Sequence, residues 1–165
     1  MKFQLHEIEG LSGEKTKIYS PMMEGDSVTL FEKFLEENNP AYPDEVTNLY
    51  DRLEIIGNET GLWDAAFDSR SGRYGTNICT LKDLPDRFLR LFFIEFGNTC
   101  IVLGSGGEKP KHVKARQEVP KLNDEVELLE RISLILQKAL KEGRFNIEDD
   151  GFITDNEDLD LIFNI

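Results

Sequence analysis

The chain has 165 residues, of which 39% are hydrophobic and eleven are Phe; this composition fits one folded domain and excludes an intrinsically disordered protein. The first nine residues lack the apolar segment of a signal peptide, and no apolar run reaches the length of a bilayer span, so we expect a protein without a membrane segment. The net charge of −13 at pH 7 argues against nucleic acid as a partner of the chain as a whole.

Two short strands are expected near the start of the chain, over residues 2–8 and 15–19. The helix that follows begins at Asp26 or Ser27, either of which can cap it, and ends at residues 38–40 (NNP). A second helix begins at residues 43–45 (PDE), because Pro suits the first turn and carboxylates favour the positive end of the helix dipole. Gly57 ends it, and the short connection predicts an antiparallel helical pair.

The middle of the chain has the period of β-strands, which are expected over residues 64–70, 74–82, 87–96 and 99–104. Apolar side chains occupy both faces of the third of these strands, as is typical of a central strand, and Gly97-Asn98 suits a hairpin turn to the fourth. A third helix is capped by Asn123 and ends at Gly143. The order of elements predicts an α+β domain in which a curved antiparallel sheet packs against the N-terminal helical pair.

The two cysteines, Cys79 and Cys100, both fall in predicted strands. We expect buried free thiols, the usual state of strand cysteines in a reducing compartment, and regard a disulfide as the less favoured alternative. Together with the lack of a recognisable signal peptide or membrane span, this leads us to expect a cytoplasmic protein.

Arg90 differs in charge from its neighbours on one face of the strand over residues 87–96, since the others on this face are Phe and Ile. A guanidinium keeps its charge when it is buried, so it needs an anionic partner or access to the rim of the sheet. In a structural ion pair the partner is Asp83, Asp86 or Glu95. In a functional site the partner is a bound phosphate, and the sequence leaves both interpretations open.

Basic side chains gather in the strand-rich third of the chain. Residues 66–116 carry nine basic and five acidic side chains, whereas residues 1–65 carry five and 14, and residues 117–165 carry five and 13. Local potential, rather than total charge, decides what a surface attracts. Two interpretations follow: an anion-binding surface, or basic residues that protect a sheet edge from aggregation.

A basic cluster follows the last predicted strand. The intervening residues 104–110 (GSGGEKP) lack the GxxxxGK(S/T) spacing of a phosphate-binding loop, so we expect no nucleotide cofactor. No His or Cys pair has the spacing of a zinc site, and we expect no resident metal. The cluster, for which a solvated loop is the alternative interpretation, consists of Lys109, Lys111, His112, Lys114 and Arg116.

Residues 144–165 form an acidic tail that also carries large apolar side chains, namely Phe152, Ile153, Leu159, Leu161, Ile162 and Phe163. We expect this tail to pack on the domain of residues 1–143 and partly to cover the surface around Arg90 and Lys109. Within the tail, residues 146–157 place Asn, Glu, Asp, Gly and Glu at positions 1, 3, 5, 6 and 12 of a calcium-binding loop. A calcium-binding module is therefore the weakest of the functional alternatives.

In this order, the elements resemble the RelE/HigB-type toxins of type II toxin–antitoxin systems, especially their phage-derived branch. The similarity covers residues 26–142. It is carried by residues 31–35, residues 49–57, the strand segment 89–94 (LRLFFI), and residues 101–104 (IVLG) followed by Lys109 and Lys111. The resemblance implies a RelE-like domain over residues 1–143, in which the strands of residues 1–20 are an N-terminal extension.

The resemblance also implies a metal-independent endoribonuclease that cleaves mRNA, with an antitoxin protein and mRNA or the ribosome as partners. In this chemistry a ribose 2′-OH attacks the adjacent phosphodiester. Arg90, Lys109 and Lys111 match family positions and are expected to stabilise the phosphoryl oxygens.

Further roles are assigned on chemistry alone. His112 is the expected general acid, because the pKa of an unperturbed imidazole lies near working pH. Arg73, Lys114 and Arg116 are expected to contact flanking phosphates. The competing hypothesis is an interaction protein that keeps this fold without catalysis and is regulated by its acidic tail; the total charge and the added tail favour it.

Overall fold

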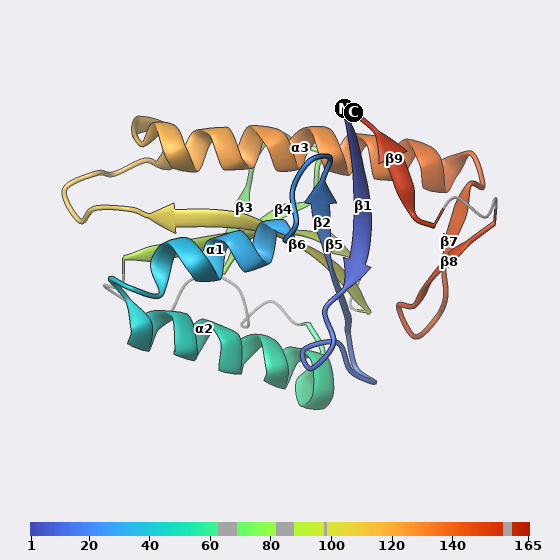
Figure 1. Cartoon of the computed structure of the whole chain (residues 1–165), viewed down its shortest axis with the longest axis horizontal. Coiled ribbons are helices and arrows are strands. Elements are labelled where there is room, and N and C mark those ends of the chain that lie inside the picture. Colours follow the sequence, from blue (N-terminus) through green and yellow to red (C-terminus); the bar gives the residue numbers. More distant parts are fainter. Residues whose placement is uncertain (63–68, 82–87, 98, 157–159) are drawn as a thin grey trace.

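The computed structural model describes residues 1–62, 69–81, 88–97, 99–156 and 160–165 (Figure 1). The helices of these residues are α1 (Leu30–Asn38), α2 (Pro43–Ile55) and α3 (Pro120–Lys141), with a π-helical turn η1 (Ile56–Thr60) and a 3-10 turn η3 (Arg116–Glu118). The strands are β1 (Lys2–Glu7), β2 (Lys17–Met23), β3 (Ser69–Ser71), β4 (Ile78–Leu81), β5 (Leu89–Phe96), β6 (Cys100–Glu108), β7 (Phe145–Ile147), β8 (Ile153–Asp155) and β9 (Ile162–Asn164).

Seven of the described strands form one sheet in the order β3-β4-β5-β6-β2-β1-β9, and β7 and β8 form a separate hairpin. Neighbours in the described sheet are antiparallel, except that β2 and β6 run parallel with Ile18 opposite Ile101. β5 and β6 form the predicted antiparallel pair in the middle of the sheet. The predicted α+β class is confirmed. The sheet is mostly antiparallel, and the parallel β2–β6 pair departs from the antiparallel sheet that the sequence predicted.

Helices cover both faces of the sheet and create two hydrophobic cores. Leu89, Leu91 and Phe93 of β5 lie in the core under α1 and α2. Phe92 and Ile94 of the same strand lie in the core under α3. All five side chains are buried, which explains why both faces of this strand are apolar.

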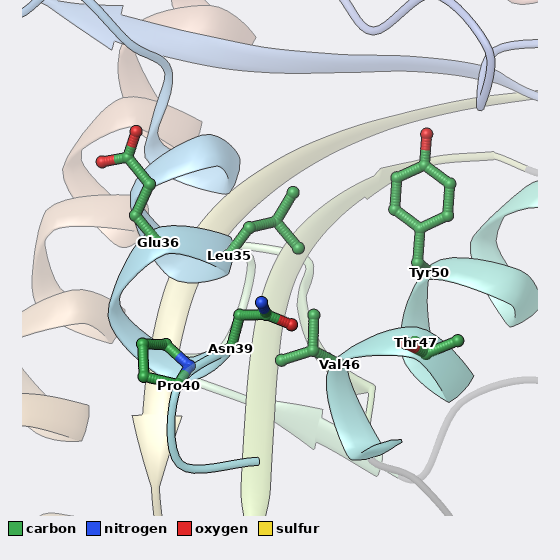
Figure 2. A pocket seen from close by; sticks show the side chains of 7 residues that line it. All are labelled: Leu35, Glu36, Asn39, Pro40, Val46, Thr47 and Tyr50. Atoms are coloured by element: carbon green, nitrogen blue, oxygen red, sulfur yellow. The ribbon is translucent and has the colours of Figure 1, made fainter. Parts of the chain in front are cut away.

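α1 and α2 form the predicted antiparallel pair and leave a surface groove between them (Figure 2). The prediction that Asp26 or Ser27 caps α1 is wrong. Thr29 is the cap: its hydroxyl accepts from the N–H of Glu32, whose carboxylate accepts from the N–H of Thr29. This reciprocal arrangement satisfies two orphan donors, whereas Asp26 pairs with the ammonium of Lys33.

α3 begins four residues earlier than predicted, with Val119 as its cap and Pro120 in its first turn. Asn123 therefore lies inside the helix and is not its cap; its Oδ1 accepts from Nη1 of Arg116 at 3.0 Å. Gly143 follows the helix with a φ of 75°, in agreement with the predicted end.

The glycine-rich segment after the predicted last strand is part of the sheet. The sequence predicts a strand that ends at residue 104, but β6 continues to Glu108. A Cβ on Gly106 would lie 1.8 Å from the carbonyl oxygen of Arg90, and a Cβ on Gly104 would lie 2.9 Å from Leu129 of α3. Close approach of β5 and α3 therefore requires these glycines, which do not form an exit loop.

Two smaller predictions concern the strand over residues 64–70 and the turn between β5 and β6. Of the strand expected over residues 64–70, positions 64–68 lie outside the described residues, and β3 begins at Ser69. Asn98 of the expected turn also lies outside them, while Gly97 has a φ of 66°.

Cys79 and Cys100 are buried free thiols, as predicted, and they lie in different cores. Burial raises the pKa of the Cys100 thiol to about 12, so this thiol stays protonated. None of the described helices combines the length and apolar composition that a bilayer span requires.

Candidate nucleic-acid interface

The side chains predicted to act on RNA gather where β5 begins and β6 ends. The N–H of Lys109 donates to the carbonyl oxygen of Phe88 at 2.8 Å, and Arg90 lies opposite Gly107 in the β5–β6 register. Lys111 follows β6, with its Nζ 5.4 Å from the centroid of the Phe88 ring. We call the set of Arg90, Lys109, Lys111, His112 and Lys114 the basic end.

A turn after β6 presents three of these side chains to solvent. The N–H of Val113 donates to the carbonyl oxygen of Pro110 at 3.0 Å and closes the turn. Nζ of Lys109 donates to the carbonyl oxygen of Lys114 at 3.1 Å, which ties the two ends of the segment together. The exposed side chains of this segment are those of Lys111, His112 and Lys114.

Arg90 is half-buried, and its Nη1 donates to the carbonyl oxygen of Leu89 at 2.9 Å. Glu95 is not the partner considered above, because it lies on the opposite face of β5 and accepts a hydrogen bond from the Sγ of Cys79 at 3.6 Å. The two other considered partners, Asp83 and Asp86, lie outside the described residues.

Two aromatic rings form a wall beside the basic end. The ring of Tyr42, at the start of α2, lies 5.6 Å from the ring of Phe88 between centroids. Its hydrogen bond with Glu108 raises the pKa of Tyr42 to about 12. The phenol therefore remains protonated and donates to the carboxylate at neutral pH.

Glu45 fixes the main chain under this wall. Glu45 is only 5% exposed. Its Oε1 accepts hydrogen bonds from the N–H groups of Phe88 and Leu89, at 2.7 and 3.3 Å. The carboxylate thus holds the first residues of β5 against the first turn of α2. Because this buried carboxylate accepts from two backbone donors, it holds the main chain beneath the site in a fixed position.

A second cluster of basic residues lines a pocket of about 510 Å³ between the β3–β4 turn, η3 and the N-terminal half of α3. It brings together Arg73 and Arg116, which were both predicted to contact phosphates, and adds Arg131. We call it the arginine pocket; its remaining lining residues are Gly72, Gln117, Asn123, Glu127 and Glu130.

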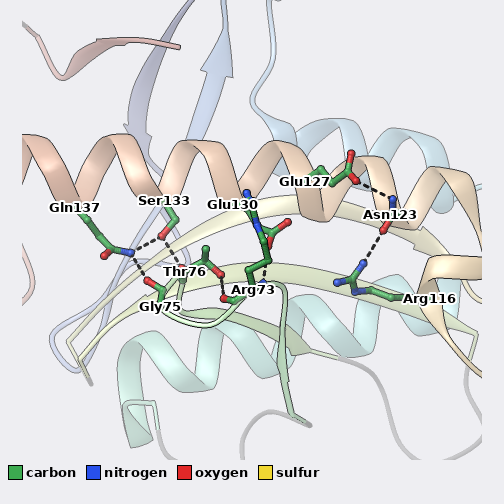
Figure 3. A network of polar contacts seen from close by, with 9 residues as sticks. All are labelled: Arg73, Gly75, Thr76, Arg116, Asn123, Glu127, Glu130, Ser133 and Gln137. Carbon is green, nitrogen blue, oxygen red and sulfur yellow. Dashed lines mark hydrogen bonds and ion pairs between the residues drawn. The ribbon is translucent and has the colours of Figure 1, made fainter.

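Hydrogen bonds hold the walls of the arginine pocket in place (Figure 3). The N–H and Nε of Arg73 both donate to Oε2 of Glu130, a residue that is only 4% exposed. Arg116 donates to Asn123, and Nδ2 of Asn123 donates to Oε1 of Glu127 at 3.1 Å. The side chain of Arg73 is 71% exposed, so its guanidinium reaches solvent while its Nε stays paired.

The arginine pocket and the basic end both lie beside helix α3. A Cβ on Gly107 would lie 3.5 Å from Lys121 and 3.6 Å from Leu122, so the first turn of α3 packs on β6 beside Arg90. Asn123, which lines the arginine pocket, directly follows Leu122 in that helix. The two clusters therefore flank the N-terminal half of α3.

Sequence reasoning missed Tyr42, Glu45 and Arg131 as site residues. Glu45 lies four residues before the buried Leu49, which puts it on the apolar face of α2 and was a readable signal. Arg131 lies four residues after Glu127 on α3, again on one helix face. Tyr42 carries no such signal, because only the fold brings it to Phe88.

The described residues of the acidic tail pack on the domain away from the basic end, whereas the sequence predicted that the tail covers it. The N–H of Ile153 donates to the hydroxyl of Tyr19 at 3.0 Å, and a Cβ on Gly151 would lie 1.7 Å from the carbonyl oxygen of Thr99. β9 pairs with β1, where Phe163 stacks on Phe3. Thr99 immediately precedes β6 and Gly107 lies near its other end, so about 25 Å separates them at about 3.3 Å per residue.

The proposed calcium loop has a different geometry from the expected one. Residue 157, the twelfth position of the predicted loop, lies outside the described residues. Residues 146–155 belong to the β7–β8 hairpin, whereas a loop of that type joins two helices. Oδ1 of Asp150 accepts from the N–H of Phe152 at 2.9 Å, and Asn146 donates to Asn156. Among the described residues, no group of three or more metal-ligating side chains occurs.

Comparison with protein-family models, with curated proteins and with solved structures finds no match to this chain.

Proposed function

We propose that the chain is a RelE/HigB-type toxin: an endoribonuclease that binds and cleaves mRNA at the basic end of a RelE-like domain. The observation that carries this proposal is the meeting of Arg90, Lys109 and Lys111 beside the ring of Phe88. Proteins commonly hold single-stranded nucleic acid in this way, with phosphates on cations and a base on an aromatic ring. The substrate is mRNA, free or on the ribosome, and an antitoxin protein is the expected partner.

In the proposed step, the ribose 2′-oxygen forms a bond to the adjacent phosphorus, and the bond from phosphorus to the 5′-oxygen breaks. The proton of the 2′-OH goes to water, and the imidazolium of His112 gives a proton to the leaving 5′-oxygen. The phosphoryl oxygens gain negative charge on the way, which Arg90 and the two lysines stabilise. The products are a 2′,3′-cyclic phosphate and a 5′-hydroxyl.

The proposal is tested by the rate at which the purified protein cleaves labelled RNA, both free and on ribosomes. Arg90→Ala is expected to lower this rate about a hundredfold, equal to about 2.7 kcal/mol of barrier, because a preorganised cation is lost. His112→Gln, at an exposed position, is expected to lower the rate at least about tenfold through loss of the acid.

Lys138→Gln is the matched control. It removes a charge that is 78% exposed on α3, at a position outside the basic end, and should leave the rate unchanged. Urea unfolding of each variant separates a loss of chemistry from a loss of fold. Wild-type rates in folded Arg90→Ala and His112→Gln variants would remove both residues from the mechanism. Absence of cleavage with either form of RNA would overturn the ribonuclease proposal.

The arginine pocket is proposed to hold flanking phosphates of the same RNA. Arg116→Gln and Arg131→Gln are each expected to reduce the slope of log affinity against log salt by about 0.7, the value for one phosphate contact on a single strand. Fluorescence anisotropy of a labelled single-stranded RNA at several salt concentrations measures the slope. Lys138→Gln should not change it, and an unchanged slope in both arginine variants would exclude the pocket from the RNA path.

The second candidate is a binding protein that has the same fold and no catalysis. It is favoured by the net charge of −13 and by the acidic helical pair, because residues 30–60 carry eight acidic and two basic side chains. Regulation by a tail over the basic end is no longer part of this candidate. A chain that cleaves neither form of RNA but binds a protein partner would support it.

A further inference from the structure

The surface groove between α1 and α2 has a volume of about 500 Å³. Figure 2 shows Leu35 of α1 and Val46 of α2 between the helices, with Tyr50 at one side. Leu35 and Tyr50 are half-buried, so apolar side chains remain accessible in the groove. Its other lining residues are Glu36, Asn39, Pro40 and Thr47.

The border of this groove is acidic. Glu36 lines it from α1 and is exposed. Asp51 and Glu54 are exposed on α2, each four residues after a lining residue, which extends the acidic border along one helix face. Residues 30–60 have a balance of −6, from eight acidic and two basic side chains. Within this segment Lys33 is paired with Asp26, Glu37 is paired with Lys121, and Glu45 is buried, so the border itself consists of Glu36, Asp51 and Glu54.

We propose that the α1–α2 groove binds a basic amphipathic helix of another protein. Apolar side chains of that helix contact Leu35 and Tyr50 above the buried Val46, and its Lys or Arg side chains face the acidic border. Helix-in-groove recognition of this kind reads apolar anchors at helical spacing. Opposite charge at the rim steers the partner and fixes its orientation.

The charges favour this occupant over a second copy of the chain. A symmetric dimer through the groove would bring Glu36, Asp51 and Glu54 close to the same carboxylates of a second copy, which is repulsive. A strand is also disfavoured, because both walls are helices whose backbone groups bond internally and offer no sheet edge. The proposal does not depend on ribonuclease activity, since the groove lies on helices that carry none of the basic end.

Two synthetic helices test the proposal. Both carry Leu at helical spacing; one has an all-Lys polar face and the other an all-Glu polar face. The Lys peptide is expected to bind the full chain, as measured by fluorescence anisotropy, and to shift the NMR signals of α1 and α2. The Glu peptide is expected to bind at least about tenfold more weakly, because it meets like charge.

Three variants locate the site. Asp51→Lys is expected to weaken binding of the Lys peptide about tenfold, and Thr47→Arg, at an exposed lining position, should block the groove. Asp124→Lys is the matched control, because it lies at an exposed position of α3 and gives the same net charge as Asp51→Lys, −11. It should not weaken binding, apart from a small effect shared by both variants.

Equal weakening in Asp51→Lys and Asp124→Lys would overturn the proposal and leave only nonspecific attraction to an acidic protein. Signal shifts centred outside α1 and α2 would also overturn it. So would a dimer of the unliganded chain in sedimentation that Thr47→Arg dissociates, since the occupant would then be a second copy. RNA cleavage by Thr47→Arg should match the wild-type rate, which keeps this test separate from the ribonuclease proposal.

Discussion

Gly106→Ala is expected to destabilise the fold by at least about 3 kcal/mol and to leave much of the purified protein unfolded. The added Cβ would lie 1.8 Å from the carbonyl oxygen of Arg90 and 2.9 Å from its carbonyl carbon. Both are main-chain atoms in the centre of the sheet, so rotation of a side chain cannot relieve the clash. The free energy of unfolding in urea measures the effect.

Gly107→Ala is the matched control in the next position of β6. Its Cβ would meet only side-chain atoms of α3, the nearest at 3.5 Å, which is ordinary van der Waals contact. We expect a change within about 1 kcal/mol, because Ala also costs less backbone entropy than Gly in a strand. Similar losses in the two variants would show that the chain around Arg90 can shift, contrary to the close approach described above.

The position of Gly106 also matters for the basic end. The β5–β6 register shifts between Leu91 and Phe93, and Gly106 is the partner of Leu91 at this irregularity. An irregularity of this kind re-aims the neighbouring strand residues, here Arg90 and its partner Gly107. The close contact at Gly106 therefore helps to set the direction of the predicted phosphate-binding arginine.

These glycines illustrate which parts of the fold could be predicted from sequence. β5 was predictable because its signal is local: apolar residues on both faces, followed by a turn dipeptide. The role of Gly106 was not, because it depends on a carbonyl group 16 residues earlier in the chain. The start of α1 was readable in principle, since Thr29 and Glu32 have the spacing of a capping box.

Some residues of the candidate site could also be predicted from the sequence, and others could not. Arg90, Lys109 and Lys111 were found because a charge on an apolar strand and a basic run both show in the sequence. Tyr42 was not found, because its contact with Phe88 joins two elements that the sequence does not relate.

The placement of the tail shows why a correct local inference can give a wrong surface. Its apolar side chains indicated that it packs, and Phe163 is buried on Phe3. We placed it by charge, over the basic residues. It lies instead where β1 offers an open strand edge for β9, so backbone hydrogen bonding and apolar contact decided its position.

Glu45→Ala is expected to lower the free energy of unfolding by about 3 kcal/mol. The substitution leaves the N–H groups of Phe88 and Leu89 without the carboxylate that accepts from them. Glu45→Gln keeps an acceptor oxygen of similar reach and should lose less, about 1–2 kcal/mol. Urea unfolding gives both values. Hydrogen exchange adds a local readout, since the amides of Phe88 and Leu89 should exchange faster in the Ala variant than in the Gln variant.

Asp44→Ala controls for the helix itself, because Asp44 is an exposed carboxylate in the same first turn of α2. Its loss should cost less than about 1 kcal/mol, the typical value for a charge near the helix dipole. If Asp44→Ala and Glu45→Ala lost equal stability, the effect of Glu45 would come from the dipole and not from β5. If the Glu45 loss is larger and confined to the start of β5, this one carboxylate couples the helical pair to the strand that carries Arg90, and RNA cleavage should fall with it.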